Sequence, residues 1–304
     1  MRVFVTGGAG FIGSHSVGAL LAADAEVVAF DNFSAGKREN LPAHARLRVV
    51  EGDTRNREAV CAAMAGCSHV LNLAAQVFVP ASIKAPGNSA HHNIVGFANV
   101  LDCAREHGIR RVVFASSAAV YGVPQSLPLT EESPTGPLSP YGLEKLVNEQ
   151  QGALFEGLAN ISPLALRYFN VYGPRQDPTS QYAGVISHFS ERLLAVEPLT
   201  VYGDGLQTRD FVYVGDVARA NVAALESTAT GVCNVGTGRS VTLLDLIETL
   251  SACVGRKPEV KYAPAQPGDI RHSAMTPARM KAFLGLEASV PLASGLATLV
   301  STLH

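Results

Sequence analysis

The sequence has little charge and no long apolar run. Only 16% of its 304 residues are Asp, Glu, Lys or Arg, and the formal net charge is −2. No basic excess favours nucleic acid, and no block of like charge indicates a tail. No apolar segment approaches the roughly 20 residues that a membrane span needs. The chain runs into a predicted strand at once, which leaves no room for a signal peptide. We therefore expect a soluble cytoplasmic protein that binds neither nucleic acid nor membrane.

Cysteine is also scarce, and its spacing forms no recognised framework. The five cysteines are odd in number and scattered, without a C-x-x-C pair. A disulfide framework or zinc site is therefore not expected, and we predict reduced, buried thiols. His91 and His92 have no third ligand at a suitable spacing, so we expect no metal. The five cysteines are Cys61, Cys67, Cys103, Cys233 and Cys253.

Short apolar runs alternate with helical patterns through the first half of the chain. This alternation predicts an α/β fold with a doubly wound parallel sheet of the Rossmann type and right-handed crossovers. The continuous apolar character of the runs is typical of strands that are buried on both faces. Strands are predicted at 3–6, 26–30, 47–51, 69–73, 111–115 and 163–167, and helices at 11–23, 56–65, 93–107 and 140–158.

The character of the chain changes after Asn170. Turn-forming residues become frequent, with short predicted helices near 181–195, 215–226 and 242–253. We expect residues 1–170 to form the Rossmann domain, with a later segment, about 205–238, returning to it. Residues 171–304 would mainly form a smaller C-terminal α/β lobe that binds substrate.

A glycine-rich turn follows the first predicted strand. Gly7, Gly10 and Gly13 have the spacing G-x-x-G-x-x-G and open an apolar helix. Glycines let the backbone approach a pyrophosphate, and the helix N-terminus favours negative charge. An ordinary glycine-rich turn is the alternative, but the position directly after an N-terminal strand favours dinucleotide binding.

Two aspartates follow the next predicted strands. Asp31 ends the second strand, where a carboxylate suits ribose hydroxyls and repels a 2′-phosphate, so NAD is favoured over NADP. Asp53 follows the third strand and could reach the adenine ring. It could also cap the helix that begins near Asn56. Both roles for Asp53 remain open.

Hydroxyl, phenol and ammonium groups form the candidate catalytic set. Ser116 and Ser117 directly follow the predicted strand 111–115, at the edge of an open sheet where ligands bind. Tyr141 and Lys145 are one helical turn apart, so both can face the same substrate. A nearby cation should lower the pKa of the phenol towards the range that proton transfer requires. Chance spacing and serine capping are the plainer alternatives.

Together these motifs resemble the extended short-chain dehydrogenase/reductases, and within them the nucleotide-sugar 4-epimerases. The resemblance covers nearly the whole chain, and the segments at 167–178 and 203–220 are the most specific. The segments that carry it are TGGAGFIGSH (6–15), NLAAQ (72–76), FASSAAVYG (114–122), YGLEK (141–145), RYFNVYGPRQDP (167–178), GDGLQTRDFVYVGDVARA (203–220), NVGTG (234–238) and PGDIRHS (267–273).

The resemblance implies roles for individual residues. Ser117, Tyr141 and Lys145 match the catalytic groups, with Tyr141 as the base and Lys145 as its activator and a ribose ligand. NAD is the implied cofactor, a nucleotide sugar the substrate, and no metal is needed. The implied cofactor contacts are Gly7, Gly10, Phe11, Ile12, Gly13, Asp31, Asn32, Asp53, Thr54, Leu73, Ala74, Ala75, Tyr141, Lys145 and Tyr168. The implied substrate contacts are Ser117, Asn170, Arg209, Asp269 and Ser273.

Positions at which this chain differs from related enzymes indicate which reaction to expect. Related dehydratases carry an Asp-Glu pair after the catalytic Ser/Thr, where this chain has Ala118 and Ala119. Simple epimerisation at C4 of a UDP-sugar is therefore favoured, and a 4-keto reductase, dehydratase or decarboxylase is the alternative. Ser273 replaces a bulky tyrosine found in related epimerases and leaves room for an N-acetyl group. Gln266 stands where an arginine is expected, so one diphosphate contact could be missing or could be supplied by Arg271.

The resemblance also implies a homodimer, formed through the predicted helices 93–107 and 140–158. A dinucleotide-sensing protein without chemistry is the remaining rival from another class. Such a protein would be expected to lose Tyr141 or Lys145, and this chain has both.

Overall fold

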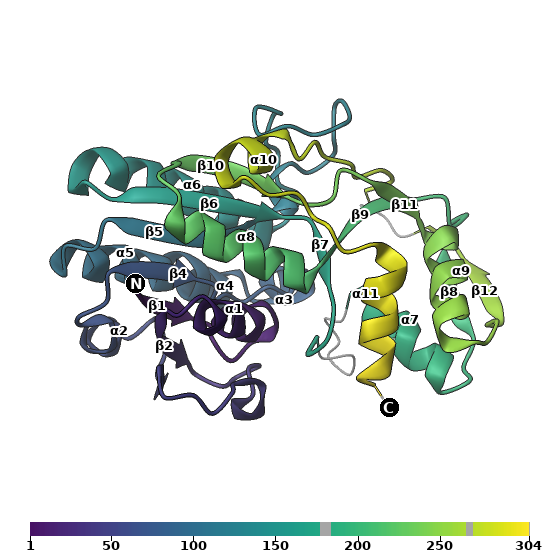
Figure 1. The fold of residues 1–304 in the computed structure, drawn as a ribbon. Helices are drawn as coiled ribbons and strands as arrows, with labels where there is room; N and C mark the ends of the chain where they lie inside the picture. Colours follow the sequence, from purple (N-terminus) through teal and green to yellow (C-terminus); the bar gives the residue numbers. More distant parts are fainter. Residues whose placement is uncertain (177–183, 266–269, 304) are drawn as a thin grey trace.

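A seven-stranded parallel sheet forms the centre of the larger lobe. The computed structural model describes residues 1–176, 184–265 and 270–303, and Figure 1 shows its two lobes side by side. The strand order is β10-β6-β5-β4-β1-β2-β3, and every neighbouring pair is parallel. The predicted doubly wound sheet is thus confirmed. Its strands are β1 (Arg2–Thr6), β2 (Glu26–Asp31), β3 (Leu47–Glu51), β4 (His69–Asn72), β5 (Arg111–Ser117), β6 (Ser162–Tyr168) and β10 (Gly231–Val235).

Helices cover both faces of this sheet because successive residues of a strand point to opposite sides. In β1, Val3 and Val5 belong to one core cluster, whereas Phe4 belongs to the other. The central strands are therefore buried on both sides, which accounts for their continuous apolar runs. One face carries α1 (Phe11–Ala22), α8 (Val214–Glu226) and α10 (Ala278–Leu284), and the other carries α2 (Arg57–Met64), α5 (Gly96–Glu106) and α6 (Pro140–Ala159).

The connection between β4 and α5 is more helical than the sequence predicted. It contains α3 (Val79–Lys84), α4 (Pro86–Ala90) and a π-helical turn, η2 (His91–Val95), which leads directly into α5. The helix predicted at 93–107 is therefore the end of a longer helical segment. Two 3-10 turns, η1 (Arg38–Asn40) and η3 (Ala118–Val120), follow β2 and β5.

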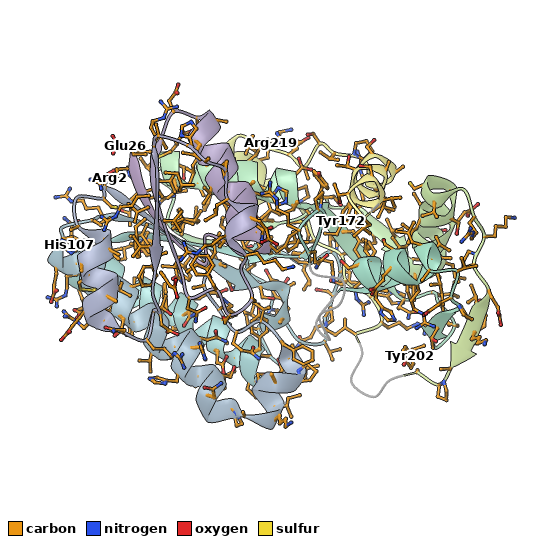
Figure 2. All side chains as sticks on the ribbon, turned by 90° about the horizontal axis from the view of Figure 1, so that it is seen from below. Arg2, Glu26, His107, Tyr172, Tyr202 and Arg219 are labelled. Atoms are coloured by element: carbon orange, nitrogen blue, oxygen red, sulfur yellow. A yellow bond between two sulfur atoms is a disulfide. The ribbon has the colours of Figure 1, made fainter. Side chains whose placement is uncertain are left out.

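The smaller lobe has its own sheets and its own apolar core. One sheet has the order β11-β9-β7, and β8 and β12 form a separate parallel pair. Figure 2 shows Tyr172 where the lobes meet and Tyr202 towards the far end of the smaller lobe. No helix within the described ranges could cross a membrane. The elements are β7 (Asn170–Tyr172), α7 (Val185–Leu194), β8 (Leu199–Tyr202), β9 (Thr208–Tyr213), β11 (Ser240–Thr242), α9 (Leu243–Val254), β12 (Val260–Ala263) and α11 (Leu292–Ser301).

A disulfide joins α2 to α5, which corrects the prediction that all five thiols are reduced. Cys61 and Cys103 are 42 residues apart in sequence, but their Cα atoms are 5.1 Å apart. Their spacing gave no signal because the pair is created by the packing of two helices on the same face of the sheet. Cys67 and Cys233 are buried free thiols, and Cys253 is partly exposed.

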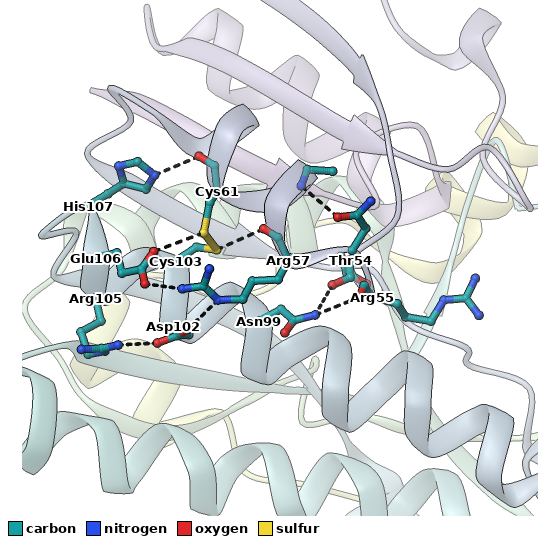
Figure 3. Close-up of a disulfide and its surroundings, with 12 residues drawn as sticks. Thr54, Arg55, Arg57, Cys61, Asn99, Asp102, Cys103, Arg105, Glu106 and His107 are labelled. Atoms are coloured by element: carbon teal, nitrogen blue, oxygen red, sulfur yellow. Dashed lines mark hydrogen bonds and ion pairs between the residues drawn. A yellow bond between two sulfur atoms is a disulfide. The ribbon is translucent and has the colours of Figure 1, made fainter.

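Charged and polar side chains reinforce the same helix pair (Figure 3). Arg57 of α2 donates to Asp102 at 2.7 Å and also contacts Glu106, both on α5. Asn99 of α5 donates to the carbonyl oxygens of Thr54 and Arg55 at 2.9 and 3.2 Å. The position of α5 is therefore linked to the loop that follows β3.

Candidate active site

The glycine-rich turn has room for backbone only. Gly7 has a positive φ of 65°, and a Cβ there would lie 2.8 Å from the nitrogen of Ala74. A Cβ on Gly13 would lie 1.9 Å from the carbonyl oxygen of Gly7. No side chain caps α1, and its first turn contains no acidic residue. This compact turn at a helix N-terminus fits a dinucleotide pyrophosphate.

Asp31 holds the glycine-rich turn in place. Its two carboxylate oxygens accept hydrogen bonds from the backbone amides of Ala9 and Phe33, each at 2.9 Å. The side chain is largely buried. The sequence did not indicate this supporting role. A carboxylate has more than two acceptor positions, so contact with ribose hydroxyls stays a prediction.

Asp53 belongs to a polar cluster at the end of β3. It accepts hydrogen bonds from Asn32 at 2.9 Å and from Arg55 Nη2 at 2.7 Å. The hydrogen bonds from Arg55 hold the pKa of Asp53 well below its usual range. The side chain that caps α2 is Asn56, which accepts from the amide of Ala59. The helix-capping alternative for Asp53 was therefore wrong.

The segment after β4 lies against the glycine-rich turn. The hydroxyl of Thr6 donates to Asn72 at 2.7 Å and accepts from the amides of Leu73 and Ala74 at 3.2 and 3.1 Å. This arrangement places the predicted cofactor contacts 73–75 beside Gly7, at the carboxyl ends of β1 and β4. It is the edge at which open parallel sheets bind ligands.

The ends of β5 and α6 bring the candidate catalytic groups together. Ser139 caps α6 by accepting from the amide of Gly142, and Pro140 occupies the first turn. Tyr141 therefore lies at the helix entry, where the Ser117 hydroxyl is near enough to the phenol to act to lower its pKa. Lys145 lies one turn later, with Nζ 5.7 Å from the centre of the Tyr141 ring. The predicted association of these three residues is present in the fold.

The electrostatics of this set differ from the expectation. Burial raises the pKa of Tyr141 to about 12, although the hydrogen bond from Ser117 opposes the rise. Burial also lowers the pKa of Lys145 to about 8, and Nζ donates to the carbonyl oxygen of Ala115 at 3.0 Å. The expected lowering of the Tyr141 pKa by Lys145 was therefore wrong for the chain alone, because desolvation dominates.

Sequence reasoning missed a buried polar network behind Tyr141. Asn93, in the π-helical turn, exchanges two hydrogen bonds of 2.8 Å with the backbone of Gln76. It also donates to Glu144 at 2.5 Å, and Ser89 donates to the same carboxylate oxygen at 2.8 Å. In the sequence, only Glu144, the acidic residue between Tyr141 and Lys145, indicated that such a network could form.

The predicted cofactor contact at Tyr168 has an unexpected orientation. Its hydroxyl donates to Asn221 of α8 at 2.7 Å, and Asn221 donates to Ser16 of α1 at 2.9 Å. The ring therefore points into the core below the sheet edge. Tyr168 is nevertheless the register partner of Ser117 on β5, so its backbone lies at the same edge.

The predicted substrate residues lie mainly on the smaller lobe. Asn170 is exposed at the start of β7, and Arg209 lies on the adjacent strand β9. The amide of Ser273 donates to the carbonyl oxygen of Thr208 at 3.1 Å, which places Ser273 beside Arg209. Arg271 pairs with Asp204 at 2.6 Å on the surface. The predicted contact at Asp269, and the departure at Gln266, fall outside the described residues.

Residues 273–276 connect the two lobes. Ser273 is hydrogen-bonded to β9, and the carbonyl oxygen of Ala274 accepts from the amide of Leu129 at 2.8 Å. The amide of Thr276 donates to the carbonyl oxygen of Leu129 at 3.0 Å. Leu129 packs with Val120, just after Ser117. Ser273 therefore lies on a segment that spans from the Arg209 strand towards the candidate catalytic edge.

Comparison with known proteins gives consistent matches over the whole chain. Residues 3–236 match the model of the NAD dependent epimerase/dehydratase family. A UDP-glucose 4-epimerase of Mycolicibacterium smegmatis is 37% identical, with 99% of this chain and 97% of the relative covered.

Two solved structures have nearly the same fold. A UDP-N-acetylglucosamine 4-epimerase from Methanobrevibacter ruminantium, solved with UDP-N-acetylmuramic acid, has a TM-score of 0.96 and 37% identity, covering 99% and 97% of the two chains. A UDP-glucose 4-epimerase of Thermus thermophilus, solved with NAD, has a TM-score of 0.91 and 40% identity, covering 99% and 98%.

Proposed function

The chain belongs to the NAD dependent epimerase/dehydratase family, and from that premise we propose that it interconverts UDP-sugars that differ in configuration at C4. Its relatives identify it as an NAD-dependent UDP-sugar 4-epimerase. The substrates that we propose are UDP-glucose with UDP-galactose, and UDP-N-acetylglucosamine with UDP-N-acetylgalactosamine. The observation that carries the proposal is the grouping of three side chains: the Ser117 hydroxyl acts on the phenol of Tyr141, and Lys145 lies one turn further along the same helix.

The glycine-rich turn and its neighbours would hold NAD. Gly7 and Gly13 leave space for the pyrophosphate at the N-terminus of α1. We propose that Asp31 and Asp53 contact the adenosine end and that Lys145 contacts the nicotinamide ribose. NAD, when bound, supplies the acceptor and donor for the hydride at C4. The larger lobe would therefore hold the cofactor, with residues 171–304 mainly holding the nucleotide sugar.

Proton transfer is the part of the reaction that the chain performs itself. We propose that Tyr141 takes the proton of the sugar 4-hydroxyl while the C4 hydride leaves, giving a 4-keto sugar. Ser117 orients the same oxygen through its hydroxyl. The keto sugar then turns about its diphosphate link, and Tyr141 returns the proton after the hydride reaches the other face.

The smaller lobe would hold the diphosphate firmly while the sugar turns. Arg209 is suited to this role because a guanidinium donates in a fork that matches phosphate oxygens. Asn170 lies on the neighbouring strand. Ser273, on the segment beside Arg209, would leave space for the 2-N-acetyl group. We also propose that the enzyme works in the cytoplasm.

A homodimer is the proposed assembly. The outer face of α6 exposes the apolar side chains of Leu143, Leu154 and Leu158, and Leu158 is 81% exposed. Such a row on one long helix is suited to packing against a second copy.

The proposed reaction is tested by incubating purified protein with UDP-N-acetylglucosamine and following the anomeric proton signals by NMR. No cofactor is added, because NAD that is regenerated in each turnover should copurify. We expect UDP-N-acetylgalactosamine to appear. Conversion of UDP-glucose alone would contradict acceptance of the N-acetyl group. Net consumption of added NAD(H) would favour the oxidoreductase alternative.

A further inference from the structure

A buried ion pair lies behind the candidate catalytic groups. Arg167 of β6 donates through Nε and Nη2 to the two carboxylate oxygens of Glu149 on α6, at 2.8 and 2.7 Å. Each side chain is only 5% exposed. A buried pair of this kind often adds no more stability than apolar side chains of similar volume. Stability alone is therefore a weak explanation for its presence.

Glu149 connects the two segments that carry the catalytic set. Its Oε1 accepts a hydrogen bond from Ser116 at 2.5 Å, and Ser116 directly precedes Ser117. On α6, Glu149 lies one turn after Lys145. One carboxylate therefore contacts the end of β5 and lies on the helix that carries the ammonium group.

Arg167 extends the network into the segment that follows Ser117. Its Nη1 donates to the hydroxyl of Tyr121 at 2.8 Å, and its guanidinium carbon lies 4.8 Å from the centre of that ring. Tyr121 in turn donates to Asn234 of β10 at 2.7 Å. Ser116, before Ser117, and Tyr121, after it, are thus both hydrogen-bonded to the same ion pair.

We propose that Glu149 is a positioning residue for the epimerisation proposed above, on which this inference rests. Through Ser116 it fixes the strand end that presents Ser117 to Tyr141. From one turn away it also presents a negative charge to the ammonium group of Lys145. Glu149 itself does not contact the sugar or the cofactor in this role.

The charges around Lys145 define a test for this role. Burial lowers the pKa of Lys145 to about 8, and Glu144 and Glu149, on the same helix, oppose that change. Arg167 faces the site from β6 as the partner of Glu149, while Tyr141 and Tyr121 are the nearby phenols. Neutralising Glu149 therefore lowers the pKa of Lys145 further, and the ammonium group is lost at a lower pH.

The experiment compares the pH dependence of kcat in the wild type and in Glu149→Gln. In the profile of kcat against pH, we expect the basic limb, where kcat falls at high pH, to move to a pH about 1 unit lower in the variant. At pH 9, kcat of the variant should therefore be about tenfold lower than that of the wild type. We expect KM to change by less than about twofold, because binding contacts remain. The double variant Glu149→Gln/Arg167→Gln leaves no unpaired guanidinium. If the single variant does not fold, the basic limb of the double variant should still move down, but by less than about 1 pH unit, because a more distant positive charge is removed as well.

Asp216→Asn is the matched control. Asp216 of α8 is a buried carboxylate that accepts from the amides of Ser289 and Val290 at 3.1 and 3.0 Å. Its replacement should lower Tm without moving the basic limb. A Glu149 variant that lowers Tm but leaves the limb at its wild-type position would overturn the positioning role. Absence of epimerase activity in the wild type would instead overturn the proposed function and this inference together.

Discussion

At the scale of single residues, burial governs the candidate catalytic groups. The high pKa of Tyr141 and the reduced pKa of Lys145 mean that a neutral phenol and an ammonium group coexist at neutral pH. The phenol is thus a proton donor in the chain alone. Its change to a proton acceptor requires added positive charge in the site, which favours the phenolate.

Tyr141→Phe tests the proton-transfer role. Removing the hydroxyl removes the group that exchanges a proton with the sugar, so kcat should fall about 10³-fold. The ring and its packing remain, so copurified NAD, measured after release from denatured protein, should be unchanged. Residual kcat within about tenfold of the wild type would exclude Tyr141 as the base.

Ser273→Tyr tests the proposed space for the N-acetyl group. The larger side chain would occupy that space, so turnover of UDP-N-acetylglucosamine should fall more than about 100-fold while UDP-glucose is still converted. The two rates are measured by NMR on the same preparation. Ser273→Ala serves as the control and should keep both activities. Equal loss of both substrates in Ser273→Tyr would remove Ser273 from the specificity argument.

At the scale of elements, features that depend on residues close in sequence could be predicted from the sequence. Features that depend on contacts between distant segments could not. The strand-turn-helix around Gly7 and the shared face of Tyr141 and Lys145 depend on residues close in sequence. The π-helical turn at Asn93 and the pairing of Glu149 with Arg167 depend on packing between distant segments. The elevated pKa of Tyr141 depends on burial, which the motif alone does not specify.

The disulfide between α2 and α5 is the clearest tertiary feature that could not be predicted from the sequence. In the chain-entropy treatment, a loop of the 42-residue separation contributes at most about 4 kcal/mol to the free energy of unfolding. Reduction should therefore lower Tm in the wild type. The variant Cys61→Ser/Cys103→Ser should have a lower Tm that no longer depends on reductant.

Thiol titration of freshly isolated, denatured protein checks the same bond. Three thiols are expected when the disulfide is formed, from Cys67, Cys233 and Cys253. Cys253→Ser is the control, because it should leave the dependence of Tm on reductant intact. Five titratable thiols would show that the isolated protein is reduced, as disulfides are rare in the predicted cytoplasmic location.

At the scale of the whole molecule, the residues that we propose for cofactor binding and for substrate binding lie mainly on different lobes. The glycine-rich turn and Tyr141 belong to the larger lobe, whereas Arg209 lies on the smaller one (Figure 1). Elements late in the sequence, α8, β10 and α10, pack on the larger sheet. The chain thus crosses between the lobes more than once, which explains why no linker is visible in the sequence.

The proposed homodimer gives a prediction at this scale. Leu154→Glu/Leu158→Glu places two charges on the exposed apolar row of α6 and should convert a dimer to a monomer, as measured by light scattering. Val196→Glu alters an equally exposed apolar side chain on the smaller lobe and should leave the mass unchanged. A wild type that is monomeric at assay concentration would contradict the proposed assembly.

The segment 273–276 has a consequence for how the lobes can separate. Its backbone is hydrogen-bonded to Thr208 in one lobe and to Leu129 in the other. Separation of the lobes beyond the reach of this short segment would therefore break at least one of these two sets of bonds. Exchange of the amides of Leu129, Ser273 and Thr276 with deuterated solvent therefore measures how often the lobes separate at this segment.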